Sequence, residues 1–250
     1  MAKMTLLEIV QDILSDMDSD EVNSINDSTE SLQVAQLVKS TYYTIIDGRD
    51  FPWMKEMFQL NATGGSSRPT YMALPDTIID LDWIKYNTRK STDTKDKFTK
   101  VEYKLPEEFL EITDQRDSSA SNILVITDPS GIKINVLNDK GPQYFTSFDD
   151  DTLVFDAYDA GIDSFLQNSK TQCYGKRSVV FTMSDSFTPD LPVQMFSYLL
   201  NEAKSNCFTT LKQVANVKAE QNSISQKRRM SQEAWKIKKG VSFPNYGRKR

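Results

Sequence analysis

The sequence predicts an α+β protein: a discontinuous helical bundle, made of N-terminal helices plus a long C-terminal helix, with an inserted antiparallel β-sandwich-like domain and a basic C-terminal arm. Three observations predict this class. Apolar residues recur at helical spacing near both ends of the chain. Between them, short β-rich runs alternate with turn signals. Finally, residues 227–250 hold nine Lys/Arg and one acid, although the whole chain has a net charge of −5.

The domain boundaries follow from these changes in pattern. We expect a helical domain from residues 1–56 and 188–236, a β-rich domain from 57–187, and an extended arm from 237–250. The N-terminal helices and the C-terminal helix each carry one apolar stripe, and neither can bury it alone. The two ends of the chain are therefore expected to pack together.

Two helices are predicted before residue 50. The first begins after Thr5, which forms a capping-box pattern with Glu8. The second begins at Ser28 or Thr29 and ends near Gly48. Their apolar stripes comprise Leu6, Val10, Ile13 and Met17 in the first, and Val34, Leu37, Val38, Thr41, Tyr42 and Ile45 in the second.

The middle of the chain reads as strands and turns. A short helix is expected at 106–112, and the sequences DPSG and NDKG mark turns. Many short strands with few helices are typical of an antiparallel sandwich or a barrel-like sheet. The predicted strands are 70–74, 78–86, 99–103, 123–127, 132–137, 152–155 and 178–182.

A long helical pattern then runs from Val193 to Val214, with Pro192 suited to its first turn. Beyond Val217 the sequence is polar nearly all round. A helix there would be an exposed rod or would lie against a partner.

Composition excludes several kinds of chemistry. The chain has no histidine, which removes Ser-His-Asp and Cys-His catalysis and the commonest metal ligand. Cys173 and Cys207 lie in different predicted elements and are expected to be free thiols in a reducing cytosol. No apolar run approaches a membrane span and no secretory signal is recognised, so no membrane contact is expected. Neither a cofactor nor a metal is expected.

Acidic residues suggest two candidate sites, each with a simpler interpretation. The group Asp149, Asp150, Asp151, Asp156 and Asp159 could hold Mg²⁺ or Ca²⁺, but a solvated turn is favoured. Two carboxylate pairs, Glu107 with Glu108 and Asp80 with Asp82, could serve glycoside hydrolysis, but ordinary surface is favoured. The Gly pair in residues 62–69 lacks the spacing of a phosphate loop.

Aromatic residues mark two further candidates. Phe51, Pro52 and Trp53 form an apolar cluster that either packs between domains, which is favoured, or contacts a neighbouring subunit. The basic end of the chain has three interpretations: it binds nucleic acid, it docks on an acidic protein surface, or it is a solvated end. Docking on a protein surface is favoured.

Several segments, taken in order, resemble the head-to-tail adaptor proteins of short-tailed bacteriophages, the tail tubular protein A-like family. The resemblance covers most of the chain, and no single motif is specific alone. The matching segments are MTLLEIVQDIL and EVNSI near the start, GRDFPW, YMALP, TSFDDDTLVFDAYDA, LPVQMF, a late AEQ, and the closing FPNYGR.

The resemblance implies a structural virion protein and not an enzyme. Members form a ring, commonly of twelve copies, at the head–tail junction beneath the portal protein, and a C-terminal arm reaches toward the portal. A downstream tail or nozzle protein is a further partner, and genomic DNA passes transiently through the channel during ejection. The protein is made in the cytoplasm of the bacterial host, and an acidic channel wall suits sliding DNA.

This function names two sets of residues. The candidate subunit contacts are Phe51, Trp53, Lys227, Arg228 and Arg229. The candidate portal-docking arm comprises Lys236, Lys238, Lys239, Phe243, Pro244, Tyr246, Arg248, Lys249 and Arg250. Two alternatives remain: a DNA-binding protein that uses residues 227–239 on phosphates, and a carboxylate glycosidase with two acids about 5 to 9 Å apart.

Overall fold

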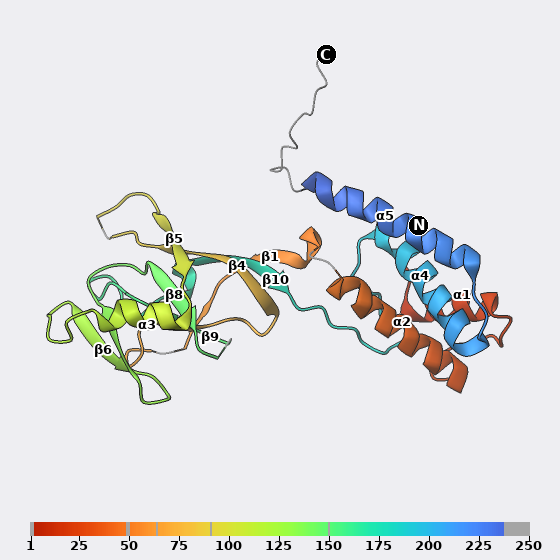
Figure 1. Ribbon diagram of the computed structural model, residues 1–250, viewed down its shortest axis with the longest axis horizontal. Coiled ribbons are helices and arrows are strands. Elements are labelled where there is room, and N and C mark those ends of the chain that lie inside the picture. Colours follow the sequence, from red (N-terminus) through yellow and green to blue (C-terminus); the bar gives the residue numbers. More distant parts are fainter. Residues whose placement is uncertain (1–2, 49–50, 64, 91, 150, 238–250) are drawn as a thin grey trace, which may run out of the picture. The chain divides into compact units, whose positions relative to one another are not determined.

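The protein is of mixed α+β class, and its chain divides into two compact units (Figure 1). The computed structural model describes residues 3–48, 51–63, 65–90, 92–149 and 151–237. A helical unit combines Met1–Met54 with Val179–Arg250, and a β unit comprises Lys55–Ser178. The division falls two residues before the first expected boundary and nine before the second.

The helical unit is built around one central helix. Helix α4 (Val193–Cys207) packs against all three other helices of the unit, α1 (Leu6–Asp16), α2 (Thr29–Asp47) and α5 (Val217–Ile237). A single-turn 3-10 helix (Pro52–Met54) follows α2, and a π-helical turn (Phe208–Lys212) follows α4.

Both predicted helix starts are confirmed by their caps. The Thr5 hydroxyl accepts a hydrogen bond from the Glu8 N–H at 3.3 Å, and the Glu8 carboxylate accepts one from the Thr5 N–H at 2.7 Å. Ser28 caps α2 through the N–H of Ser31 at 3.0 Å. These bonds satisfy backbone donors that a helix start leaves open.

The end of α1 has an unusual residue in its left-handed position. Asp18 has a φ of 55°. The N–H of Ser19 donates to the carbonyl of Leu14 at 3.1 Å, and the N–H of Asp18 donates to that of Ser15 at 3.3 Å. This is a Schellman motif, in which glycine is the usual residue because a Cβ is crowded there.

Replacing Asp18 by glycine is therefore expected to raise the free energy of unfolding by about 1 kcal/mol. The change relieves the left-handed backbone and removes a negative charge from a helix C-terminus. Thermal unfolding followed by circular dichroism measures it. Asp20→Gly is the control, because Asp20 is exposed and its φ is negative. Equal gains in both variants would contradict the explanation.

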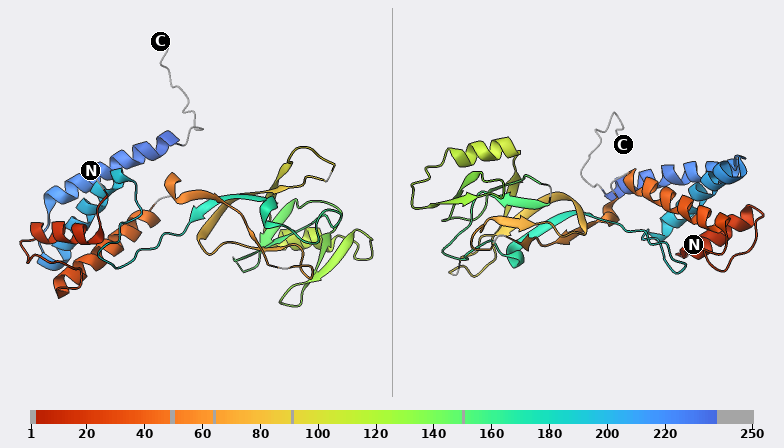
Figure 2. Two further views of the ribbon diagram at one scale, coloured as in Figure 1. Left: turned by 180° about the vertical axis from the view of Figure 1, so that it is seen from behind. Right: turned by 90° about the horizontal axis from the view of Figure 1, so that it is seen from below.

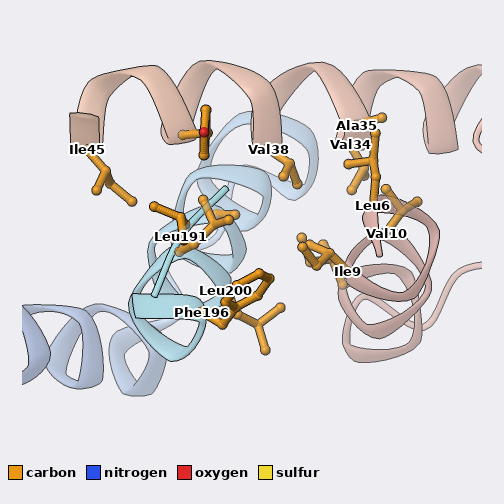
Figure 3. Close-up of a cluster of buried hydrophobic side chains, with 14 of the residues drawn as sticks. Leu6, Ile9, Val10, Val34, Ala35, Val38, Ile45, Leu191, Phe196 and Leu200 are labelled. Atoms are coloured by element: carbon orange, nitrogen blue, oxygen red, sulfur yellow. The ribbon is translucent and has the colours of Figure 1, made fainter. Parts of the chain in front are cut away.

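One hydrophobic core joins the two ends of the chain. Figure 3 shows side chains from α1, α2 and α4 pointing toward one another, together with Leu191 from the segment before α4. The labelled members are Leu6, Ile9, Val10, Val34, Ala35, Val38, Ile45, Leu191, Phe196 and Leu200. Burial of such side chains contributes about 1.5–3 kcal/mol each, so α1 and α2 depend on α4.

The prediction of a strand at residues 178–182 is wrong. This segment has no strand and packs on the helical core through Phe181, whose ring lies 5.2 Å from that of Tyr42 and 4.7 Å from that of Phe187. The N–H of Leu6 also donates to the carbonyl of Phe187 at 2.7 Å. These contacts place residues 179–187 in the helical unit.

Helix α5 does not continue α4 as a rod. The π-helical turn and a left-handed Gln213, with a φ of 54°, turn the chain so that α5 packs on α4 (Figure 1 and Figure 2). Ala219 and Ser223 are buried in this contact. The hydroxyl of Ser223 donates to Glu202, and the side-chain amide of Gln226 donates to the Ser197 hydroxyl. Small and polar residues make this interface, so no apolar stripe revealed it.

The β unit contains one twisted eight-stranded sheet and a separate hairpin, in place of the expected sandwich. Strand order is β1-β10-β4-β5-β8-β9-β3-β2; all pairs are antiparallel except β5 with β8. The strands are β1 (Lys55–Phe58), β2 (Asn61–Ala62), β3 (Tyr71–Ala73), β4 (Ile78–Asn87), β5 (Phe98–Tyr103), β8 (Tyr144–Ser147), β9 (Thr152–Phe155) and β10 (Thr171–Arg177). The hairpin pairs β6 (Ile123–Thr127) with β7 (Lys133–Leu137).

The predicted short helix is confirmed as α3 (Pro106–Asp114), which supplies Phe109 to the core of the β unit. Strands β1, β2, β8 and β10 were not expected. The buried face of β10 carries Thr171, Cys173 and Gly175, which give no apolar alternation. Gly175 is needed there, because a Cβ would lie 2.2 Å from the carbonyl oxygen of Asp80.

Candidate functional site

The basic C-terminal segment begins on α5. Lys227, Arg228 and Arg229 are exposed on this helix. Lys236 lies near its end. The other candidates of the docking arm lie outside the described residues: Lys238, Lys239, Phe243, Pro244, Tyr246, Arg248, Lys249 and Arg250.

Phe51 and Trp53 belong to the helical core. Phe51 is 6% exposed, and its ring stacks on Trp53 with centroids 6.0 Å apart and planes 27° apart. Trp53 is half-buried against the same core. Both rings therefore pack within the helical unit. Little of the Phe51 ring is left for a subunit contact, because its own unit covers it.

A small cavity of about 120 Å³ lies beside Phe51 within the helical unit. Residues of α2, α4 and α5 line it, among them Thr41, Glu202, Asn206 and Lys227. Asn206 donates to the Thr41 hydroxyl at 3.0 Å. Lys227 thus extends from α5 toward α2. Arg228 lies on the outward side of α5.

Charge is strongly segregated in the helical unit. Residues 3–48 hold nine carboxylates and two lysines, and residues 193–229 hold six Lys/Arg and two carboxylates. The two groups meet at Lys204, whose ammonium lies 2.7 Å from Asp12 and 2.6 Å from Asp16. Lys212 pairs more loosely with Glu30 at 3.5 Å. Burial alone would lower the pKa of Lys204, but the carboxylates of Asp12 and Asp16 raise it. Lys204 therefore binds α1 in its charged form.

A second candidate site is a cavity of about 550 Å³ within the β unit. The hydroxyl of Tyr71 donates to Asp128 at 2.7 Å, and the guanidinium of Arg68 lies over the Tyr71 ring, 5.7 Å from its centroid. Apolar side chains complete the wall. They are Leu110, Pro129, Ile132, Ile134, Phe148 and Val154.

The electrostatics of this cavity oppose acid catalysis by Asp128. Burial would raise the pKa of Asp128, but hydrogen bonds from Tyr71 and from the hydroxyl and N–H of Ser130 lower it below the ordinary value. Burial and the Asp128 carboxylate raise the pKa of Tyr71. Asp128 is therefore held as an anion, whereas a glycosidase acid must hold a proton near neutral pH.

In the acidic group considered for a metal, Asp149 and Asp156 have separate structural roles, and Asp150 lies outside the described residues. Asp149 accepts the N–H of Thr152 at 2.7 Å and so shapes the turn before β9. Asp156 is fully buried in an ion pair with Arg116 at 2.7 Å. Within the part of the chain that the structure describes, no three His, Cys, Asp or Glu side chains are grouped to hold a metal ion.

The carboxylate pairs are part of the surface. Asp82 pairs with Lys55 at 2.7 Å, and Glu108 lies 3.9 Å from Lys104. The site at Arg68, Tyr71 and Asp128 was missed by sequence reasoning. Tyr71 and Asp128 are 57 positions apart in the sequence and meet only in the folded unit.

No model of a known protein family matches the chain, and no curated protein matches it. In the described residues, none of the helices is both long and apolar enough to span a membrane.

Proposed function

We propose that the chain is a structural protein of a short-tailed bacteriophage virion, the adaptor that joins the portal to the tail. In this proposal it is a discontinuous helical bundle with an inserted β domain and a basic docking arm. Copies form a ring around the DNA ejection channel at the head–tail junction. The portal lies above the ring and a tail or nozzle protein lies below it.

The observation that carries the proposal is the way the basic segment is attached. It starts on α5, which is held to α4 through buried Ala219 and Ser223. Helix α4 is in turn held to α1 by Lys204. A cationic and aromatic segment that leaves a firmly packed helix suits docking on a separate, acidic protein surface.

The test is deletion of residues 243–250. We expect the truncated protein to keep its circular dichroism spectrum and melting temperature, because the deleted residues follow the last described helix. We also expect it to lose binding to the portal protein, measured by co-sedimentation and electron microscopy of portal complexes.

Two matched variants divide the effect. Phe243→Ala with Tyr246→Ala removes the aromatic anchors, and Arg248→Ala with Lys249→Ala and Arg250→Ala removes charge. Aromatic anchors dominate docking energy more often than exposed charges, so the first variant should bind portal more weakly than the second. If the truncated protein still supports normal completion of phage heads, the proposal is wrong.

A second candidate is favoured by three consecutive exposed cations on α5, Lys227, Arg228 and Arg229. If α5 binds nucleic acid, affinity must fall steeply between about 50 mM and 200 mM salt as phosphate counterions return. A gel shift at low salt with double-stranded and single-stranded DNA tests this. Absence of any shift at low salt removes the candidate.

A further inference from the structure

Helix α5 has an outward face that the described residues of its own chain leave exposed to solvent. Val217, Gln221, Ile224 and Arg228 follow one another at spacings of four, three and four, which places them on one side of a helix. Val217 is 57% exposed and Ile224 is 45% exposed. A hollow along this side is lined by Gln221, Ile224, Ser225, Arg228 and Arg229. We call Val217, Gln221, Ile224 and Arg228 the outer α5 face.

The outer α5 face points away from α4. At about 100° per residue, Ala219, Ser223 and Gln226 lie on the other side of the helix. Those three make the contact with α4. Side chains of α4 therefore cannot cover Ile224 or Arg228.

The same unit carries an acidic segment with no basic residue. The connection between α1 and α2, residues 17–28, holds four acids and no Lys or Arg. All four, Asp18, Asp20, Glu21 and Asp27, are exposed. We call these four residues the acidic connection.

The acidic connection is held in a fixed shape. Val22 is 6% exposed and Ile25 is 1% exposed, so both anchor it to the core. The N–H of Ile25 donates to Asp185 at 2.8 Å. Asp27 accepts the N–H groups of Asn23 and Ser24 at 2.7 and 2.8 Å. A rigid surface loses little conformational entropy when it binds.

We propose that the outer α5 face of one copy docks on the acidic connection of a second copy of this chain. Charge selects the occupant: inside one subunit, lysines of the α4 region already bind acids of the N-terminal region through Lys204 and Lys212. The proposed contact repeats that pairing between subunits with Arg228. It also covers Val217 and Ile224, which nucleic acid phosphates would leave in water.

The geometry of this contact makes it head-to-tail. The two surfaces belong to different parts of the helical unit, so each copy uses one surface on each neighbour. Such heterologous contacts generate closed rings or open filaments. The inference rests on the proposed function for its ring, and it names the two surfaces that would form it.

Disulfide trapping tests the contact directly. The double variant Glu21→Cys/Ile224→Cys, oxidised at low ionic strength, should give a ladder of trimers and larger species on a non-reducing gel. A mixture of the two single variants should stop at dimers, because each copy then carries one reactive surface. Neither single variant alone should cross-link. Native thiols do not interfere, because Cys173 and Cys207 are buried.

Charge reversal supplies the matched control. Adding Arg228→Glu to the double variant should lower the yield of trimers and larger species at least tenfold, and adding Asp20→Arg as well should restore it. Both positions are exposed, so circular dichroism should stay unchanged. A double variant without species above the dimer, or a ladder that ignores charge reversal, overturns the inference. The experiment needs neither portal nor residues 243–250, so it can fail while the portal test succeeds, and the reverse.

Discussion

Replacing Asp156 by asparagine is expected to lower the free energy of unfolding of the β unit by about 3–5 kcal/mol. The Asp156 side chain is fully buried, and one carboxylate oxygen lies 2.7 Å from the guanidinium of Arg116. The other oxygen accepts the N–H groups of Gln143 and Tyr144, each at 2.9 Å. An amide in this place would turn either a donor or a weaker acceptor toward Arg116.

The loss arises from the charge left behind. Arg116 is 13% exposed and also donates to the carbonyl oxygens of Asn135 and Asp156, so the backbone holds it in place. A buried guanidinium without its carboxylate has lost water and gained no counter-charge. Arg116→Met combined with Asp156→Leu should therefore recover part of the stability that the single variant loses.

Urea denaturation measures the effect, with Asp82→Asn as the control. Asp82 also pairs with a cation at 2.7 Å, but Lys55 and Asp82 are 21% and 32% exposed. Solvent screens such a pair, so its loss should cost no more than about 1 kcal/mol. Equal losses in the two variants would contradict the argument from burial.

The second large effect concerns thiol chemistry. Burial raises the pKa of both Cys173 and Cys207 to about 12. At pH 8 only about one thiol in 10⁴ is then ionised, against roughly a quarter for an ordinary cysteine. Because the thiolate is the nucleophile, reaction with a disulfide reagent in the native protein should be about 10³-fold slower than in urea.

Each thiol reports on one unit, since Cys207 belongs to the helical core and Cys173 to the core of the β unit. Cys173→Ala and Cys207→Ala isolate the two signals. The absorbance of the thiolate that the disulfide reagent releases gives the rate of labelling of each thiol. Rapid labelling of either single-thiol variant under native conditions would show that its thiol is not shielded as described.

The elements that sequence patterns located are those whose signals are local. Thr5 and Glu8 mark the start of α1 because a capping box needs only four residues. The strands at 123–127 and 152–155 were located to the residue, because β-forming side chains fill them and turn residues bound them.

The elements that were missed are held by tertiary contacts. Helix α5 packs through Ala219 and Ser223, which form no apolar stripe. In the same way, Phe181 lies in a segment with the sequence pattern of a strand, but its ring packs against Tyr42 and Phe187 in the helical core. Packing overrode local preference in both cases.

The candidate sites show the same division. Composition shows that the C-terminal segment is basic, since charge can be counted along the chain. Sequence does not show that Asp156 is buried, because Arg116 lies 40 positions away. Nor does it show the cavity at Tyr71, whose partner Asp128 lies in the turn between β6 and β7.

The shared core of α1, α2 and α4 has a consequence for synthesis on the ribosome. The chain leaves the helical unit after Met54 and returns at Val179. At 5–20 residues per second, the segment between takes roughly 6–25 s to make. Throughout that interval α1 and α2 are complete but lack the helix that buries their apolar stripes. The β unit, whose residues are contiguous, is finished first, and the nascent N-terminal helices are the part of the chain that a chaperone would meet.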